Sequence, residues 1–170
     1  MKSSICCFSG YRPEKMPAGM QEGSPAFADM IRRLRLAVCD AADRGYRHFL
    51  SGMSRGFDIW AAEAVLDLAQ QGLNIDLWAA IAFPGMQQNW EPAWRARYDD
   101  ALAQARRVFP LFESYVPDCY TARDRFLVDQ SSLCICFFDG TPGGTQYTVE
   151  RARRSGLAVE NLADSQLSFL

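Results

Sequence analysis

Residues 133–138 read Leu-Cys-Ile-Cys-Phe-Phe, and residues 139–145, which follow directly, read Asp-Gly-Thr-Pro-Gly-Gly-Thr. The first six residues are all apolar, which is typical of a strand that is buried on both faces of a sheet. The next seven predict a glycine-rich turn, and a helix is predicted over 145–155, where Gly156 ends it. A buried strand that passes through a tight turn into a helix indicates an α/β protein.

The same alternation continues along the rest of the chain. Apolar patterns predict further strands at 5–9, 47–51, 75–83, 107–112 and 157–162, and further helices at 27–42, 58–71, 90–105 and 121–130. Alternating strands and helices with short connections predict a mostly parallel sheet with helices on both faces, an α/β/α arrangement of three layers. We expect one domain that comprises residues 1–170.

Composition narrows the class of protein. Of the 170 residues 49% are apolar and 22% are charged, and the formal net charge is -2. These values are typical of a globular domain, and the small acidic excess argues against a dedicated nucleic-acid-binding protein. No run approaches the roughly 18 apolar residues that a bilayer span needs, and the N-terminal apolar run is too short for a signal peptide. We therefore expect a cytoplasmic protein without a membrane partner.

Six cysteines raise the question of a metal site. The chain has no CxxC pair and a single histidine, His48, whereas structural zinc usually requires such spacing. Cys6, Cys7, Cys134 and Cys136 lie within strand-like apolar runs. We expect them to be buried thiols in a reducing compartment, with no metal and no cofactor.

In parallel sheets, ligands bind beyond the carboxyl ends of the strands, so the turns after the predicted strands are the candidate sites. In the turn 139–145, glycines let backbone N–H groups approach an anion, and the start of a helix adds partial positive charge. Thr145 can cap the helix or donate its hydroxyl to a phosphate. A tight connection without a ligand is the alternative. The candidates here are Asp139, Gly140, Gly143, Gly144 and Thr145.

A second glycine-rich turn lies at 51–58, which reads Ser-Gly-Met-Ser-Arg-Gly-Phe-Asp. Arg55 could pair with a phosphate, and Asp58 is placed either to cap the next helix or to contact the ligand. Two such turns in one parallel sheet favour a ligand site more than either does alone. The candidates here are Ser51, Gly52, Arg55, Gly56 and Asp58.

The turn after the first predicted strand adds Gly10, Tyr11 and Arg12. Tyr11 could stack on a base and Arg12 could hold a phosphate or a carboxylate, although a plain surface loop explains them as well. Arg123 could close the site from the side, or lie on a solvated helix face.

Three more residues complete the candidate set. Pro84 and Trp90 could form a pocket wall. Glu63 could bind ribose hydroxyls or act as a general acid or base, or be an ordinary surface residue.

Several of these motifs, in this order, resemble the YpsA-like family of uncharacterised bacterial proteins in the SLOG superfamily. They are Ser-Gly-Tyr-Arg-Pro at 9–13, the block 52–63, Pro84, Trp90, Tyr98, the segment 123–129, and Asp139-Gly140 with Gly143-Gly144-Thr145. The superfamily also holds the DNA-processing protein DprA/Smf and the "Lonely Guy" (LOG) phosphoribohydrolases. The resemblance implies a Rossmann-like fold and a nucleotide or nucleotide-derivative ligand.

Two departures from related motifs bear on function. LOG hydrolases carry Pro-Gly-Gly-x-Gly-Thr-x-x-Glu, whereas residues 142–150 read Pro-Gly-Gly-Thr-Gln-Tyr-Thr-Val-Glu. This keeps Glu150 in register but lacks the third glycine and the threonine that follows it. The family usually has Arg-Asn where this chain has Arg123-Asp124, and a carboxylate there would weaken anion binding or change its hydrogen-bond partner.

These observations lead to three functional hypotheses. The first is a module that binds a nucleotide, possibly one resembling ADP-ribose, and signals to a protein partner. The second is a phosphoribohydrolase that cleaves a nucleoside monophosphate at its glycosidic bond with Glu150 or Glu63. The third, single-stranded DNA binding by analogy with DprA, is opposed by the net charge. The exposed aromatics expected near Trp90 and the apolar tail 167–170 predict a homodimer.

Overall fold

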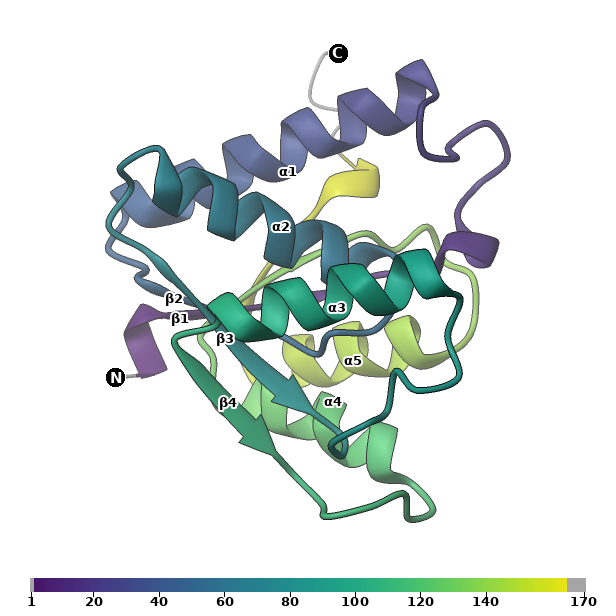
Figure 1. Ribbon diagram of the computed structural model, residues 1–170. Helices are drawn as coiled ribbons and strands as arrows, with labels where there is room; N and C mark the ends of the chain where they lie inside the picture. The colour runs from purple at the N-terminus through teal and green to yellow at the C-terminus, as the bar shows by residue number, and fades with distance from the viewer. Residues whose placement is uncertain (1, 165–170) are drawn as a thin grey trace.

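Strands and helices alternate along the whole of residues 2–164, the part of the chain that the computed structural model describes (Figure 1). The strands are β1 (Ile5–Ser9), β2 (His48–Ser51), β3 (Asp76–Ile81), β4 (Arg107–Pro110), β5 (Leu133–Cys136) and β6 (Ala158–Asn161). The helices are α1 (Pro25–Asp43), α2 (Phe57–Gln70), α3 (Pro92–Gln104), α4 (Cys119–Asp129) and α5 (Gly144–Arg154), with short 3-10 turns η1 (Lys2–Ser4) and η2 (Pro13–Lys15).

The six strands form one sheet in the order β4-β3-β2-β1-β5-β6, and every neighbouring pair is parallel. Strand β1 is central, with Cys7 opposite Leu50 of β2 on one side and opposite Cys134 of β5 on the other. The predicted parallel α/β fold of Rossmann-like type is thereby confirmed.

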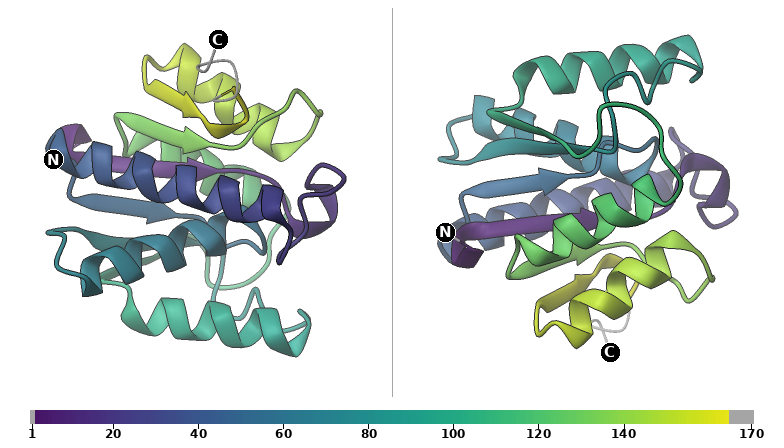
Figure 2. Two further views of the ribbon diagram at one scale, coloured as in Figure 1. Left: turned by 90° about the horizontal axis from the view of Figure 1, so that it is seen from above. Right: turned by 90° about the horizontal axis from the view of Figure 1, so that it is seen from below.

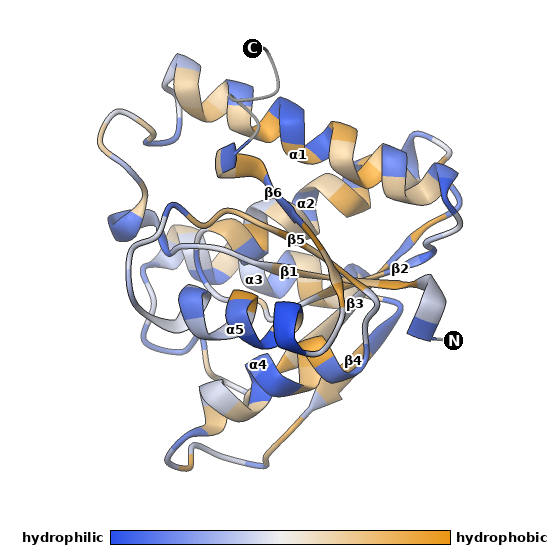
Figure 3. Cartoon of the chain, turned by 180° about the vertical axis from the view of Figure 1, so that it is seen from behind, coloured by the Kyte–Doolittle hydropathy of each residue, from blue (hydrophilic) through white to orange (hydrophobic). Residues whose placement is uncertain are grey.

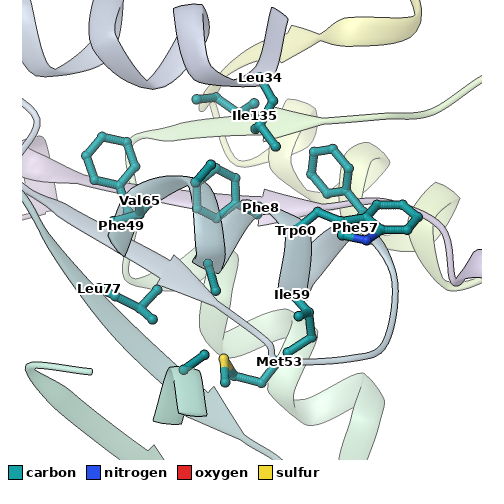
Figure 4. Packing of buried hydrophobic residues seen from close by; sticks show 14 of the residues in the cluster. Phe8, Leu34, Phe49, Met53, Phe57, Ile59, Trp60, Val65, Leu77 and Ile135 are labelled. Carbon is teal, nitrogen blue, oxygen red and sulfur yellow. The ribbon is translucent and has the colours of Figure 1, made fainter. Parts of the chain in front are cut away.

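Helices cover both faces of the sheet in three layers (Figure 2). Side chains alternate between the faces along β1, so that Cys6 and Phe8 pack towards α1, α2 and α3, while Ile5 and Cys7 pack towards α4 and α5. Figure 4 shows the larger of the two cores, where the ring of Phe8 lies among side chains of the neighbouring strands and of α1 and α2. Figure 3 shows hydrophilic residues prevailing on α5, which covers the opposite face.

Helix starts differ from the sequence prediction for local reasons. Helix α1 begins at Pro25, before the predicted start at 27, because the Ser24 hydroxyl accepts a hydrogen bond from the Phe27 N–H at 3.1 Å. Helix α3 begins at Pro92, since proline fits the first helical position, and this leaves Trp90 in the preceding loop. None of the helices within residues 2–164 is long and apolar enough to cross a bilayer.

The strand order reverses at β1. The chain moves outward from β1 through β2 and β3 to β4 on one side, and resumes with β5 and β6 on the other. Helices α1 and α5, which follow β1 and β5, lie on opposite faces of the sheet and leave a crevice at the carboxyl ends of these two strands, where α/β sheets of this kind bind ligands.

Candidate functional site

A cavity of about 240 Å³ lies at this crevice. It is bounded by the loop after β1, the loop between β2 and α2, one side of α4 and the start of α5. The polar, charged and glycine residues that line it are Ser9, Gly10, Tyr11, Arg12, Lys15, Ser54, Asp58, Tyr120, Thr121, Arg123, Asp124, Gly143, Gly144, Thr145 and Thr148. The structure thus brings all three predicted turns and Arg123 to one place.

Arg123 joins the loop between β2 and α2 to helix α4 in the interior of the cavity. Its guanidinium is buried and donates to the Gly52 carbonyl at 3.0 Å and to the Ser54 hydroxyl at 2.9 Å. Its Nε and Nη2 both donate to Asp124 Oδ1, at 3.2 and 3.0 Å. Burial lowers the pKa of Arg123, but the carboxylates of Asp124 and Asp58 outweigh burial and leave the pKa raised. Four of its five N–H groups are therefore committed to the protein.

Space for this guanidinium depends on Gly52. A Cβ at that position would lie 2.9 Å from Arg123 Nε and 3.1 Å from its Cδ, closer than side-chain atoms tolerate. Gly52, which stays a predicted ligand-site residue, thus leaves room for the arginine, and its carbonyl accepts a hydrogen bond from Arg123.

Asp58 lies beside Arg123 in the first turn of α2. The residue is 7% exposed, and its Oδ2 accepts a hydrogen bond from the Ser54 N–H at 3.3 Å, so the carboxylate reaches back into the loop. Burial raises the pKa of Asp58 from the usual 3.8 to about 6, with a lowering contribution from Arg123 and a raising one from Asp124.

Tyr11 links the loop after β1 to the glycine-rich turn before α5. Its hydroxyl donates to Asp139 Oδ1 at 2.7 Å and accepts from the Asp139 N–H at 3.1 Å, and the Thr145 hydroxyl donates to the Gly10 carbonyl at 2.9 Å. The hydrogen bond from Tyr11 lowers the pKa of Asp139. Tyr11 and Asp139 thus brace the cavity wall, while Thr145 binds backbone and does not cap α5.

The mouth of the cavity is cationic. Arg12 and Lys15 are exposed, and neither side chain forms a hydrogen bond or ion pair with the rest of residues 2–164. The Lys15 ammonium lies over the start of α5, since a Cβ on Gly143 would be 3.5 Å from Lys15 Nζ. Figure 2 shows the loops after β1 and β5 at the same edge of the molecule.

Other predicted site residues lie away from the cavity lining. Arg55 pairs with Glu14 at 3.0 Å, and Glu63 pairs with Arg97 at 2.6 Å on the side where α2 meets α3. Glu150 is exposed on α5 and accepts a hydrogen bond from Gln146 at 3.2 Å.

Five more predicted residues are also absent from the cavity lining. Trp90 packs edge-on against Tyr98, and Pro84 is exposed in the loop after β3. Ser51 donates its hydroxyl to the Asp58 carbonyl at 2.9 Å and so supports the second turn from below. Gly56 precedes α2, and Gly140 lies exposed in the turn beside Asp139.

The sequence analysis considered Asp124 only as a departure from the family pattern beside Arg123. The polar lining residues that were not predicted from the sequence are Ser9, Lys15, Ser54, Tyr120, Thr121 and Thr148. Lys15 had a local signal, since it follows the Gly10–Pro13 turn by two residues. Thr148 is one helical turn after Gly144, whose carbonyl accepts its hydroxyl at 3.1 Å.

Within residues 2–164 no three His, Cys, Asp or Glu side chains are grouped so as to hold a metal ion. Cys6, Cys7, Cys134 and Cys136 are fully buried free thiols in the neighbouring strands β1 and β5. The polar groups that line the cavity and can contact a ligand are hydroxyl, carboxylate, guanidinium and ammonium groups.

The elevated pKa of Asp58 predicts a distinct dependence of stability on pH. Between about pH 4 and 6 the folded protein holds a proton that the unfolded chain has lost, so ionisation of Asp58 costs stability as the pH rises. Asp58→Asn removes this cost. We expect the stability of the variant relative to the wild type to increase by about 2 kcal/mol between pH 4 and 7.

Urea unfolding of both proteins at pH 4, 5, 6 and 7 measures this difference. Asp129→Asn is the matched control, because Asp129 is an exposed carboxylate outside the cavity that also pairs with an arginine, Arg151. Parallel pH profiles for Asp58→Asn and the wild type would contradict the assignment.

The sequence was compared with family models and with known proteins, and the matches identify its family. The YpsA family model, described as the YspA SLOG family, matches residues 6–162. UPF0398 proteins of Bacillus cereus (strain G9842) and Bacillus thuringiensis (strain Al Hakam) are each 23% identical to this chain over 162 residues, which is 92% of this chain and 86% of theirs.

Two solved structures share the fold. DNA processing protein A (DprA) from Streptococcus pneumoniae superposes with a TM-score of 0.62 at 18% identity over 93% of this chain, which spans half of the DprA chain. DprA from Helicobacter pylori, whose structure concerns its single-stranded DNA binding mode, gives a TM-score of 0.66 at 14% identity over 98% of this chain and 73% of its own. Since the family model covers nearly the whole described chain, this protein belongs to the YspA SLOG family.

Proposed function

We propose that this protein binds a phosphate-bearing small molecule, a nucleotide or nucleotide derivative, in the cavity between β1 and α5. The observation that carries the proposal is the position of the unpaired Lys15 ammonium over Gly143 at the start of α5. The first amides of a helix and a cation that face the same space form an anion site. Arg12 adds a second unpaired cation at the same mouth.

Binding is better supported than glycosidic cleavage. Both glutamates considered as catalytic carboxylates lie outside the cavity, with Glu63 paired to Arg97 and Glu150 exposed on α5. The two carboxylates that do line the cavity, Asp58 and Asp124, accept hydrogen bonds from the Ser54 N–H and from Arg123. Incubation with AMP and detection of free adenine tests the hydrolase alternative directly.

Single-stranded DNA binding, which the H. pylori DprA structure concerns, has less support in this chain. The net charge is -2, and the two cations at the cavity mouth do not form the extended basic groove that follows a nucleic-acid backbone.

A signalling partner and a homodimer stay predictions. The apolar tail 167–170 that suggested self-association lies outside the described residues, and native mass spectrometry of the full chain measures both the assembly and any ligand carried through purification.

Isothermal titration tests the proposal with inorganic pyrophosphate, AMP, ADP and ADP-ribose as probes. We expect at least one nucleotide to bind. The affinity for that nucleotide should fall about tenfold in Lys15→Ala and in Arg12→Ala, because each substitution removes a charge-assisted contact to phosphate.

Arg154→Ala is the matched control, since Arg154 is exposed at the opposite end of α5 and should leave the affinity unchanged. The absence of binding by every probe at millimolar concentration would overturn the proposal.

A further inference from the structure

The interior of the cavity differs in character from its mouth. The mouth presents the cations Arg12 and Lys15, whereas the interior presents two carboxylates, Asp58 and Asp124. Arg123 lies near both carboxylates and has one N–H group that donates to no atom of the described residues and is left for a ligand. A ligand that enters this cavity therefore meets positive charge first and hydrogen-bond acceptors further in.

Each carboxylate has an oxygen to spare. Asp58 uses Oδ2 for the Ser54 N–H, and Asp124 uses Oδ1 for both of its bonds from Arg123. Asp58 Oδ1 and Asp124 Oδ2 accept no hydrogen bond from any other part of residues 2–164. Although Asp58 is only 7% exposed, Asp58 Oδ1 is not among the fully buried polar atoms that lack a partner, so it faces the cavity, where a ligand can supply a donor.

We propose that the ligand presents a vicinal diol, as the ribose of a ribonucleotide does, to Asp58 Oδ1 and Asp124 Oδ2, while its phosphate lies at Lys15 and the start of α5. This inference rests on the proposed function and specifies its ligand class. Two adjacent hydroxyls supply one neutral donor for each carboxylate, and a 2′-deoxy sugar leaves one acceptor unmet.

An amine would be a less suitable donor. The charged residues that line the cavity are three cations, Arg12, Lys15 and Arg123, against two carboxylates, so an added ammonium group meets net repulsion. Neutral hydroxyls satisfy the same acceptors without that cost. The Asp124 carboxylate thus favours ligands that carry a ribose and lowers the affinity for phosphate alone.

Isothermal titration of the wild type with the four common ribonucleoside 5′-monophosphates, their 2′-deoxy counterparts and inorganic pyrophosphate tests the inference. We expect a ribonucleotide to bind about tenfold more tightly than its 2′-deoxy form, because the lost hydroxyl leaves a charged acceptor unpaired.

Asp124→Asn should reduce that ratio to within about threefold and strengthen pyrophosphate binding, since its amide would turn a donor towards the cavity. Asp129→Asn, on the same helix but outside the cavity, should keep the wild-type ratio.

The outcomes separate the two proposals. If the wild type binds none of these probes, nor ADP-ribose, the proposed function fails and the diol inference with it. If it binds ribonucleotides and their 2′-deoxy forms equally, only the diol inference fails. Tighter binding of a 2′-amino-2′-deoxynucleotide than of the ribonucleotide would overturn the diol in favour of an amine. Because these comparisons use the wild type, they stand even where Asp124→Asn folds poorly.

Discussion

Replacing Gly56 by alanine is expected to destabilise this protein by about 3 kcal/mol or more, because the new methyl group combines backbone strain with a clash against main-chain atoms. Gly56 has a φ of +89°, a conformation that other residues rarely adopt. A Cβ there would lie 2.5 Å from the Tyr11 carbonyl oxygen and 2.8 Å from the Arg12 Cα. Neither atom belongs to a flexible side chain that could turn away.

Gly72→Ala provides the matched control, since Gly72 has a φ of +111° and open space around its missing side chain. It carries the strain alone and should cost about 1–2 kcal/mol. Urea unfolding at pH 7 measures both variants, and equal losses would show that the contact with the loop after β1 does not matter. Because that loop carries Arg12 and Lys15, Gly56→Ala should also weaken nucleotide binding, whereas Gly72→Ala should not.

Removal of the Arg123 side chain is expected to have the other large effect. Arg123→Ala strands the carboxylates of Asp58 and Asp124 in a buried setting and leaves the Gly52 carbonyl without its donor. Breaking a buried ion pair in this way typically costs about 3–5 kcal/mol. Since Arg123 favours the ionised form of Asp58, its loss raises the pKa of that carboxyl further, and the destabilisation should shrink as the pH falls from 7 to 5.

Arg125→Ala controls for the loss of an arginine from α4, because Arg125 is exposed two residues further along the same helix. Such surface changes usually alter stability by less than about 0.5 kcal/mol. Urea unfolding at pH 5 and 7 distinguishes the variants. A loss for Arg123→Ala that equals the loss for Arg125→Ala, or that grows towards pH 5, would contradict the central role of this guanidinium.

The fold was predictable because its signals are local. The sequence patterns predict a strand or a helix at each of the six strands and five α-helices of the described chain, and their alternation indicates the parallel sheet, whereas the 3-10 turns η1 and η2 were not predicted. The ends of the strands were less predictable, because buried apolar residues can continue beyond the last residue that is paired with a neighbouring strand. The apolar run that starts at Leu133 continues to Phe138, but β5 ends at Cys136. The Phe138 N–H donates to the side-chain amide oxygen of Asn161 and not to a backbone carbonyl of a neighbouring strand.

The candidate site was predictable where a turn alone builds it, as at Gly143 and Gly144. It was not predictable where distant residues decide the outcome. Arg55 and Arg12 both follow strand ends in glycine-containing turns. Arg55 nevertheless forms an ion pair with Glu14, whereas Arg12 forms none with the described residues 2–164. Pairing of this kind depends on which loops meet in space, and no local pattern records it.

The central place of β1 has a consequence for how the protein is made. Tyr11 and Asp139, which brace one wall of the cavity, are 128 residues apart in sequence. A growing chain on the ribosome exposes β1 early, but β5, which covers the second side of β1, emerges only after more than a hundred further residues. Until then β1 is an edge strand with unpaired backbone groups, open to wrong partners. Ligand binding is thus available only after α5 has emerged, and a nucleotide present during synthesis would stabilise the folded domain without assisting the shorter nascent chain.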